Sequence, residues 1–295
     1  MLNHTASLYL SAVLIWGSTW FAIKFQLGVV AEEVSLVYRF GLAALILLLF
    51  CHFTNRRLRY SLAEHGFIAL QGLFLFSSNY LVFYWATHLL TSGIVALMFS
   101  TVILMNIVNG ALFLGTVVRP RVIVGACLGI AGIAAIFWSE VSSVGDNADT
   151  WRGLWMCLLA TWFASVGNIV SARNQRQGIP VVQANAWGMA YGALVMAAYA
   201  LVSGAEFNFD PTWPYGLSLF YLAVFGSILA FGSYLTLVGR IGADKAAYAA
   251  VLFPVIALGL STLFEDYQWT LRALFGFALV LLGNYVVLSR GKATA

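Results

Sequence analysis

Residues 34–54 read VSLVYRFGLAALILLLFCHFT, a run in which Arg39 is the one fully charged side chain. The hydrocarbon core of a bilayer is roughly 30 Å thick, and about 20 predominantly apolar residues in a helix are enough to cross it. This stretch has that length and that composition, so it predicts a transmembrane helix.

The rest of the chain divides in the same way at polar, glycine or proline interruptions. The first 20 residues lack the basic start and the cleavage site of a signal peptide, so we expect them to form a membrane helix as well. The third and fourth segments are separated only by His88 to Ser92. The ten predicted spans are 5–24, 34–54, 66–87, 91–114, 121–139, 151–171, 183–203, 214–238, 244–264 and 271–290.

The composition excludes an ordinary soluble domain. The chain is 62% hydrophobic and 9% charged, whereas soluble domains carry about 25% charged residues. The formal net charge of +4 is spread over scattered basic pairs, so nucleic acid is not an expected partner. Cys51, Cys127 and Cys157 show no C-x-x-C spacing, so we expect no metal and no cofactor. The lipid bilayer is the expected surrounding.

The basic residues predict the orientation of the chain. Lys and Arg stay preferentially on the cytoplasmic side of a membrane. With both termini in the cytoplasm, an even number of spans puts most of them on that side. The residues expected there are Arg56, Arg57, Arg59, Arg119, Arg121, Arg173, Arg176, Arg240, Lys245, Arg290 and Lys292, or 11 of 15.

The two halves of the chain, residues 1–145 and 146–295, resemble each other as an internal repeat. Weak matches run in the same order through both halves. They pair Trp16 with Trp162, Asn79-Tyr80-Leu81 with Ser233-Tyr234-Leu235, and Arg121, Gly125 and Gly132 with Arg272, Gly276 and Gly283. Five helices per half is an odd number, so the second copy enters the membrane upside down. The predicted fold is an all-α membrane protein, with ten transmembrane helices in two inverted five-helix repeats forming one integral membrane domain.

Three short motifs carry a resemblance to a known family. Trp16-Gly17-Ser18-Thr19-Trp20, Tyr38-Arg39-Phe40 and Leu263-Phe264-Glu265 resemble the drug/metabolite transporter superfamily of the EamA type. The many aromatic residues resemble the aromatic amino acid exporters in it. The resemblance implies a protein of the bacterial inner membrane that exports aromatic and other hydrophobic amino acids or related small amphiphiles by alternating access. Gly115 stands where the first repeat would match Glu265, so no role requiring two symmetric acids is expected.

The candidate substrate site consists of polar and aromatic residues within the spans, because sites of inverted-repeat transporters lie near the midplane. Tyr80, Tyr84 and His88 follow an i, i+4 spacing that lines one helix face. Interfacial aromatic belts and interhelical hydrogen bonds are the alternative roles. The other candidates are Trp16, Ser18, Thr19, Asn79, Phe99, Trp162, Ser165, Asn168, Tyr234 and Tyr248.

Proline and glycine positions suggest structural roles inside the spans. Pro254 lies well within a span and predicts either a hinge or a fixed kink. Gly125 and Gly129 form a G-x-x-x-G step, and Gly276 and Gly283 give another helix a small-residue face. These glycines favour close helix packing or a dimer contact over ligand binding.

Charged residues all fall near the ends of the predicted spans, and this restricts the function. An intramembrane charge would mark a functional site, so its absence favours an uncharged or zwitterionic substrate and facilitated transport without a proton relay. An importer of the same fold, or a carrier of another uncharged metabolite, stays open. An intramembrane enzyme or a channel is disfavoured, since neither paired intramembrane aspartates nor a filter sequence is present. The oligomeric state stays open, and a monomer is compatible with the sequence.

Overall fold

The computed structural model describes residues 2–26, 28–90, 92–136, 148–250 and 269–288, together with residues 138, 142, 252, 253 and 256. All regular structure in this described part is helical. The elements are α1 (Leu2–Ile23), η1 (Lys24–Gln26), α2 (Glu32–Phe53), α3 (Leu62–Leu73), η2 (Phe74–Ser78), α4 (Asn79–Thr87), α5 (Ser92–Ser100), α6 (Val102–Leu114), α7 (Pro120–Ile136), α9 (Ala148–Arg176), α10 (Val181–Ser203), α11 (Trp213–Tyr221), η3 (Leu222–Leu229), α12 (Ala230–Ile241), α13 (Ala243–Ala246) and α15 (Leu271–Leu288).

The prediction of a helical membrane protein is confirmed. Within the described residues, helices at Glu32–Phe53, Leu62–Ala86, Ala148–Arg176, Val181–Ser203 and Trp213–Ile241 are long and apolar enough to cross a membrane. Shorter apolar helices occupy Met98–Leu114, Pro120–Ile136 and Leu271–Val287.

The helix ends follow local sequence signals. At the start of α3 the Ser61 backbone N–H donates to Glu64 Oε2 at 2.6 Å, and the Glu64 N–H donates to Ser61 Oγ at 3.3 Å. This reciprocal capping box satisfies two amide groups that the helix leaves without partners. The chain after α6 turns at Gly115 (φ 62°), and the chain after α10 turns at Gly204 (φ 75°). Both are left-handed conformations that glycine adopts without a steric cost.

Two predicted spans differ from what the structure shows. Span 91–114 is divided at Thr101 into α5 and α6, and the Thr101 side chain donates to the Met98 carbonyl at 2.6 Å. The predicted span 244–264 begins with the short helix α13, and most of its later residues lie outside the described residues. Pro254 and the Leu263-Phe264-Glu265 motif are among those residues, so the structure describes neither the hinge candidate nor the acidic motif.

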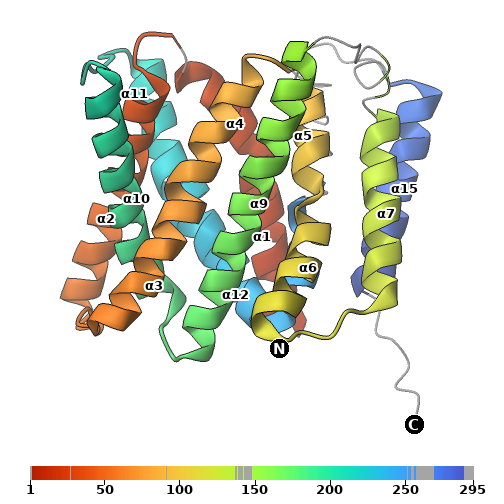
Figure 1. The fold of residues 1–295 in the computed structure, drawn as a ribbon, viewed down its shortest axis with the longest axis horizontal. Helices are drawn as coiled ribbons and strands as arrows, with labels where there is room; N and C mark the ends of the chain where they lie inside the picture. The colour runs from red at the N-terminus through yellow and green to blue at the C-terminus, as the bar shows by residue number, and fades with distance from the viewer. Residues whose placement is uncertain are drawn as a thin grey trace.

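The basic residues of the loops gather at one end of the bundle, the lower face in Figure 1, where α1 also begins. This face carries the loops at residues 54–61, 115–119 and 177–180. Arg176 Nη1 donates to the Leu114 carbonyl at 3.1 Å, which joins the ends of α9 and α6. We call this face the basic end. The start of α2, which carries Glu32 and Glu33, and the loop between α10 and α11 lie toward the opposite end.

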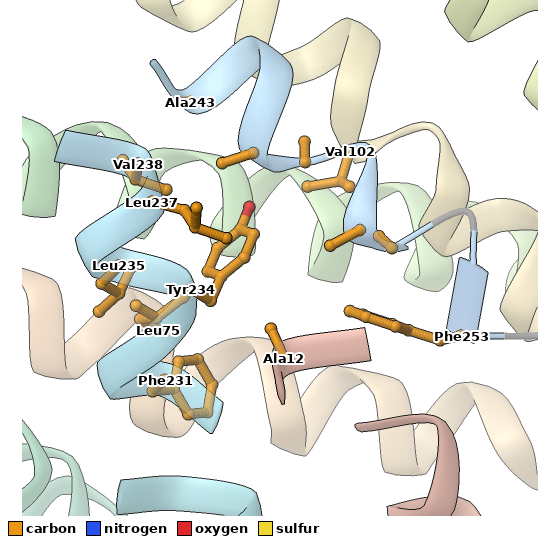
Figure 2. Packing of buried hydrophobic residues seen from close by; sticks show 14 of the residues in the cluster. Ala12, Leu75, Val102, Phe231, Tyr234, Leu235, Leu237, Val238, Ala243 and Phe253 are labelled. Atoms are coloured by element: carbon orange, nitrogen blue, oxygen red, sulfur yellow. The ribbon is translucent and has the colours of Figure 1, made fainter. Parts of the chain in front are cut away.

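The main core lies between the helices of both halves of the chain. It joins Ala12 of α1 and Val102 of α6 to Phe231 and Tyr234 of α12. Figure 2 shows Tyr234 extending from α12 toward Val102 and Ala243, away from the backbone of its own helix. The first and second halves therefore share one packed interior.

Helices α7 and α15 pack backbone against backbone at the right edge of Figure 1. A Cβ atom on Gly132 would come within 2.6 Å of the Gly276 carbonyl oxygen, and one on Gly125 within 2.8 Å of the Gly283 oxygen. Only glycine allows so close an approach. The expectation of close helix packing at these glycines is thus met within a single chain.

Gly132→Ala should destabilise the folded protein, because the added methyl group meets the Gly276 carbonyl. Overpacking of this kind costs roughly 1–3 kcal/mol. We expect a lower thermal unfolding midpoint in detergent than for wild type. Gly41→Ala is the matched control, since a Cβ on this helical glycine meets nothing within 4 Å. Equal midpoints for the two variants would contradict the packing described here.

Candidate functional site

Two π-helical turns interrupt the helices nearest the interior. In η2 the Ser77 hydroxyl donates to the Leu73 carbonyl at 2.6 Å, and in η3 the Ser227 hydroxyl donates to the Leu222 carbonyl at 3.0 Å. Both serines are fully buried. π-Helical turns are rare and occur frequently at functional sites, so the residues beside them are the first to consider.

Arg39 is buried beside η3, with only 4% of its surface exposed. It lies seven residues after Glu32 in α2, about 10 Å along the helix axis. Its Nε donates to Ser227 Oγ at 3.0 Å. Its guanidinium carbon lies 5.1 Å from the centroid of the Tyr80 ring and 5.3 Å from that of Phe40.

The sequence analysis placed Arg39 near the start of the predicted span 34–54 and did not expect its charge to be buried among the helices. Arg39 was assigned to a helix end because α2 was expected to begin at residue 34, whereas it begins at Glu32. Its side chain also points into the bundle, where a serine 188 positions away in sequence accepts its hydrogen bond. Sequence spacing alone does not reveal such a partner.

A continuous set of rings crosses the interior next to Arg39. The centroid distances are 5.2 Å from Phe253 to Trp16, 4.8 Å from Trp16 to Phe231 and 5.0 Å from Phe231 to Phe76. From Phe76 the set continues to Phe40 at 5.6 Å and to Tyr80 at 5.2 Å. We call Phe253, Trp16, Phe231, Phe76, Phe40 and Tyr80 the aromatic layer.

Gly226 of η3 connects the aromatic layer to Arg39. Trp16 Nε1 donates to the Gly226 carbonyl at 3.0 Å. A Cβ atom at Gly226 would lie 3.1 Å from Thr19 Cγ2 and 3.3 Å from Arg39 Nη2. Ser18, the residue directly before Thr19, shares a 2.6 Å hydrogen bond with the Tyr221 hydroxyl. The predicted residues Trp16, Thr19 and Tyr80 thus meet around two residues that the sequence analysis missed, Arg39 and Gly226.

A second polar group lies nearer the basic end. Asn109 Nδ2 donates to Ser165 Oγ at 2.8 Å, and Asn168 Nδ2 donates to the Tyr234 hydroxyl at 3.2 Å. Asn106 Nδ2 donates to the Ala243 carbonyl at 3.0 Å. Ser165, Asn168 and Tyr234 were predicted, whereas Asn106 and Asn109 were missed. We call Asn106, Asn109, Ser165, Asn168 and Tyr234 the amide cluster.

Four buried amide oxygens accept no hydrogen bond from the described part of the chain, and one of them is Gln183 Oε1. The other three are the Oδ1 atoms of Asn79, Asn106 and Asn168, on residues that are 6%, 1% and 3% exposed. A buried acceptor without a donor costs roughly 1–3 kcal/mol. A ligand with N–H or O–H groups would supply the missing donors.

Two predicted residues lie away from this interior. Trp162 is 40% exposed, on the same outer stripe of α9 as Trp155 and Leu159. The buried face of α9 carries small and polar residues instead, so the structure does not bring Trp162 to Trp16. His88 lies near the end of α4 with a 65% exposed side chain, and its Nε2 is 3.1 Å from Glu32 Oε1.

The remaining candidates have distinct surroundings. Tyr84 is partly buried and packs against the main core. Phe99 packs on Phe83, with ring centroids 5.5 Å apart. Tyr248 is fully buried, and its hydroxyl lies close to the glycine contact of α7 and α15. Among the described residues no group of three or more His, Cys, Asp or Glu side chains is placed to hold a metal ion.

Comparison with known proteins decides the family. The sequence profile of the EamA-like transporter family matches residues 5–138 and again residues 151–289. The chain belongs to this family. The EamA-like chain is 28% identical over 282 residues to the inner membrane transporter YedA of Escherichia coli (strain K12), covering 92% of this chain and 89% of YedA.

Further similarities extend over nearly the whole chain. The transporter YoaV of Bacillus subtilis (strain 168) is 22% identical over 281 residues, covering 94% of each chain. A solved crystal structure matches 97% of this EamA-like chain and 96% of its own chain, with a TM-score of 0.80 and 17% sequence identity. The last similarity shows a shared fold.

Gly226→Ala should impair transport by this EamA-like protein. The new methyl group presses on Thr19 and Arg39 and alters the carbonyl to which Trp16 donates. We expect at least a fivefold lower initial rate in proteoliposomes for any substrate that the wild type carries. Gly232→Ala is the control, because a Cβ there meets nothing within 4 Å. Loss of transport in both variants would show that the effect is not specific to Gly226.

Proposed function

We propose that this membrane transporter exports aromatic and other hydrophobic amino acids, or related small amphiphiles, across the bacterial inner membrane. The observation that carries the proposal is the aromatic layer, which lies between the buried Arg39 and the buried amide cluster. Aromatic faces bind planar apolar groups, while the amide oxygens accept hydrogen bonds. YedA, the relative from E. coli, is described as an inner membrane transporter, which supports the same location here.

The architecture proposed for this function is ten spans in two inverted five-helix repeats, residues 1–145 and 146–295. The family profile matches once in each half. The glycine contacts support the same arrangement: the repeat relates Gly125 to Gly276 and Gly132 to Gly283, and the contacts join Gly125 to Gly283 and Gly132 to Gly276. Exchanging the halves leaves this set of contacts unchanged, as expected at a twofold axis between inverted copies.

Alternating access would proceed by rocking of the two repeats around the aromatic layer. The layer crosses the boundary between them, since Trp16 and Phe76 of the first half contact Phe231 of the second. The Arg39 to Ser227 hydrogen bond crosses it too. A substrate that separates these contacts can replace them with its own ring and polar groups. The basic end is proposed to face the cytoplasm, in accord with the preference of Lys and Arg for that side.

The experiment is uptake of labelled tryptophan and phenylalanine into proteoliposomes. We expect saturable uptake by wild type and at least a tenfold loss of kcat/KM in Tyr80→Ala, because the ring facing Arg39 and Phe40 is removed. Trp162→Ala is the matched control and should keep the wild-type rate, since Trp162 lies on the outer stripe of α9.

Two outcomes would contradict the proposal in different ways. Uptake retained in Tyr80→Ala would support the proposed substrates but contradict the proposed binding site at the aromatic layer. Folded wild-type protein that carries neither amino acid would discard the substrates and direct the search to other metabolites, including those taken up by an importer.

Transport should persist when the proton gradient is collapsed. Among the described residues the partly buried carboxylates lie at helix starts, as Glu32 and Glu64 do, so no acid is placed to relay a proton through the interior. The measurement is the initial rate of phenylalanine uptake with and without a protonophore. A strict requirement for the gradient would overturn facilitated transport, even if the substrates were correct.

A further inference from the structure

We propose that Arg39 binds the carboxylate of the transported molecule, so that this protein selects small apolar monocarboxylates and rejects the corresponding amines. The inference rests on the proposed function, because it assigns the recognition step to the same interior site.

The first argument is the buried charge of Arg39, which no carboxylate in the described part of the chain compensates. The side chain is 4% exposed inside a membrane helix, and no carboxylate of the described residues lies within 4 Å of its nitrogens. Burial of an unpaired charge is costly, and intramembrane arginines therefore pair with another ionisable group or with backbone carbonyls and often mark a substrate pathway. A substrate carboxylate would supply the missing negative charge.

The second argument is the orientation of the guanidinium. Ser227 accepts a hydrogen bond from Nε while its own hydroxyl donates to the Leu222 carbonyl of the π-helical turn. The serine is thus fixed at both sides and holds one edge of the guanidinium. The Tyr80 hydroxyl also hydrogen-bonds to the guanidinium. Nη1 and Nη2 form the fork whose geometry matches the two oxygens of a carboxylate.

The third argument is what surrounds this fork. Nη2 lies close to the backbone of Gly226, since a Cβ atom at this glycine would come within 3.3 Å of it. The Tyr80 and Phe40 rings lie 5.1 and 5.3 Å from the guanidinium carbon. A substrate with a carboxylate next to a flat apolar group would place the first on Arg39 and the second on the aromatic layer. One guanidinium balances one carboxylate, whereas a phosphate dianion would retain an unpaired charge.

If Arg39 only held helices together, its replacement would have different effects from those expected of a substrate-binding residue. As a tie between α2 and η3, Arg39 contributes its hydrogen bond to a neutral serine and its contacts with the Tyr80 and Phe40 rings. A glutamine could make such a bond without burying a charge. A tie would also affect every substrate equally, whereas a carboxylate-binding residue affects only substrates that carry the carboxylate.

The test compares ligands that share one ring and differ in charge. Competition against labelled phenylalanine is measured in proteoliposomes with 3-phenylpropionate, which lacks the ammonium group, and with phenethylamine, which lacks the carboxylate. For wild type we expect 3-phenylpropionate to compete at least tenfold better than phenethylamine. Equal competition by the two would overturn the inference without any variant.

Variants then assign the discrimination to Arg39. Arg39→Gln should raise the KM for phenylalanine at least tenfold and abolish the preference for 3-phenylpropionate, while Arg39→Lys should keep part of it. Ser227→Ala, which leaves the charge but removes its tether, should weaken the preference several-fold. Arg152→Gln is the matched control, because it removes the same charge from an exposed position at the start of α9.

Two further measurements distinguish a misfolded variant, a wrong substrate and a wrong binding site. Thermal unfolding in detergent shows whether each variant is folded, and if Arg39→Gln is not, then Arg39→Lys and Ser227→Ala decide. Binding of 3-phenylpropionate and phenethylamine to the purified protein, followed by tryptophan fluorescence, does not depend on transport. A protein that carries no phenylalanine but binds the acid through Arg39 would refute the proposed amino acid substrate and keep the carboxylate site. Equal loss of both ligands in folded Arg39→Gln would refute the site.

Discussion

The hydrocarbon core of a bilayer contains no water to pair with a backbone amide, so the chain must satisfy its own N–H and C=O groups. Helical segments pair these groups within the backbone, and at two breaks between helices a side chain donates to a backbone carbonyl. At the break between α5 and α6 the Thr101 hydroxyl donates to the Met98 carbonyl. At the break after α12 Asn106 Nδ2 donates to the Ala243 carbonyl. The irregular backbone thus lies inside the bundle, where polar side chains reach it, and the amide cluster forms around one of these breaks.

Lipid tails are as apolar as leucine, so hydrophobicity does not hold one membrane helix against another. Small residues and buried hydrogen bonds take over this role. Gly125, Gly132, Gly276 and Gly283 bring the backbones of α7 and α15 together. Near the C-terminal end of α3, Gln71 Nε2 donates to Asn185 Oδ1 at 3.0 Å and Asn174 Nδ2 donates to Gln71 Oε1 at 3.1 Å, which joins α3, α9 and α10. These contacts fix the outer helices and leave the interior to the aromatic layer.

The interior combines contacts that can separate during transport with a charged group that can bind a substrate. Trp16, Phe231 and Phe76 close the space between the halves through ring contacts, which are individually weak and can separate without breaking a covalent or ionic link. Arg39 lies at one end of these rings and carries a charge that the described residues do not neutralise. The contacts that rocking of the two halves would break are thus mostly non-directional ring contacts. The Arg39 guanidinium, whose hydrogen bonds are directional, is held in place by Ser227.

The sequence by itself determined the helical membrane fold, most span positions and the family. These follow from local quantities: apolar length, scattered charges and short motifs such as Trp16-Gly17-Ser18-Thr19-Trp20. It also indicated Trp16, Tyr80, Asn168 and Tyr234 as interior residues, because their polar or aromatic side chains stand within apolar runs. It misjudged Arg39 and Trp162, and it gave no signal for Ser227 or Gly226 as partners of a residue far away in the chain. Only the tertiary structure decides these, because the direction in which a side chain points depends on which helix lies beside it. In a chain that is apolar on nearly every helix face, periodicity does not distinguish the face toward lipid from the face toward the interior.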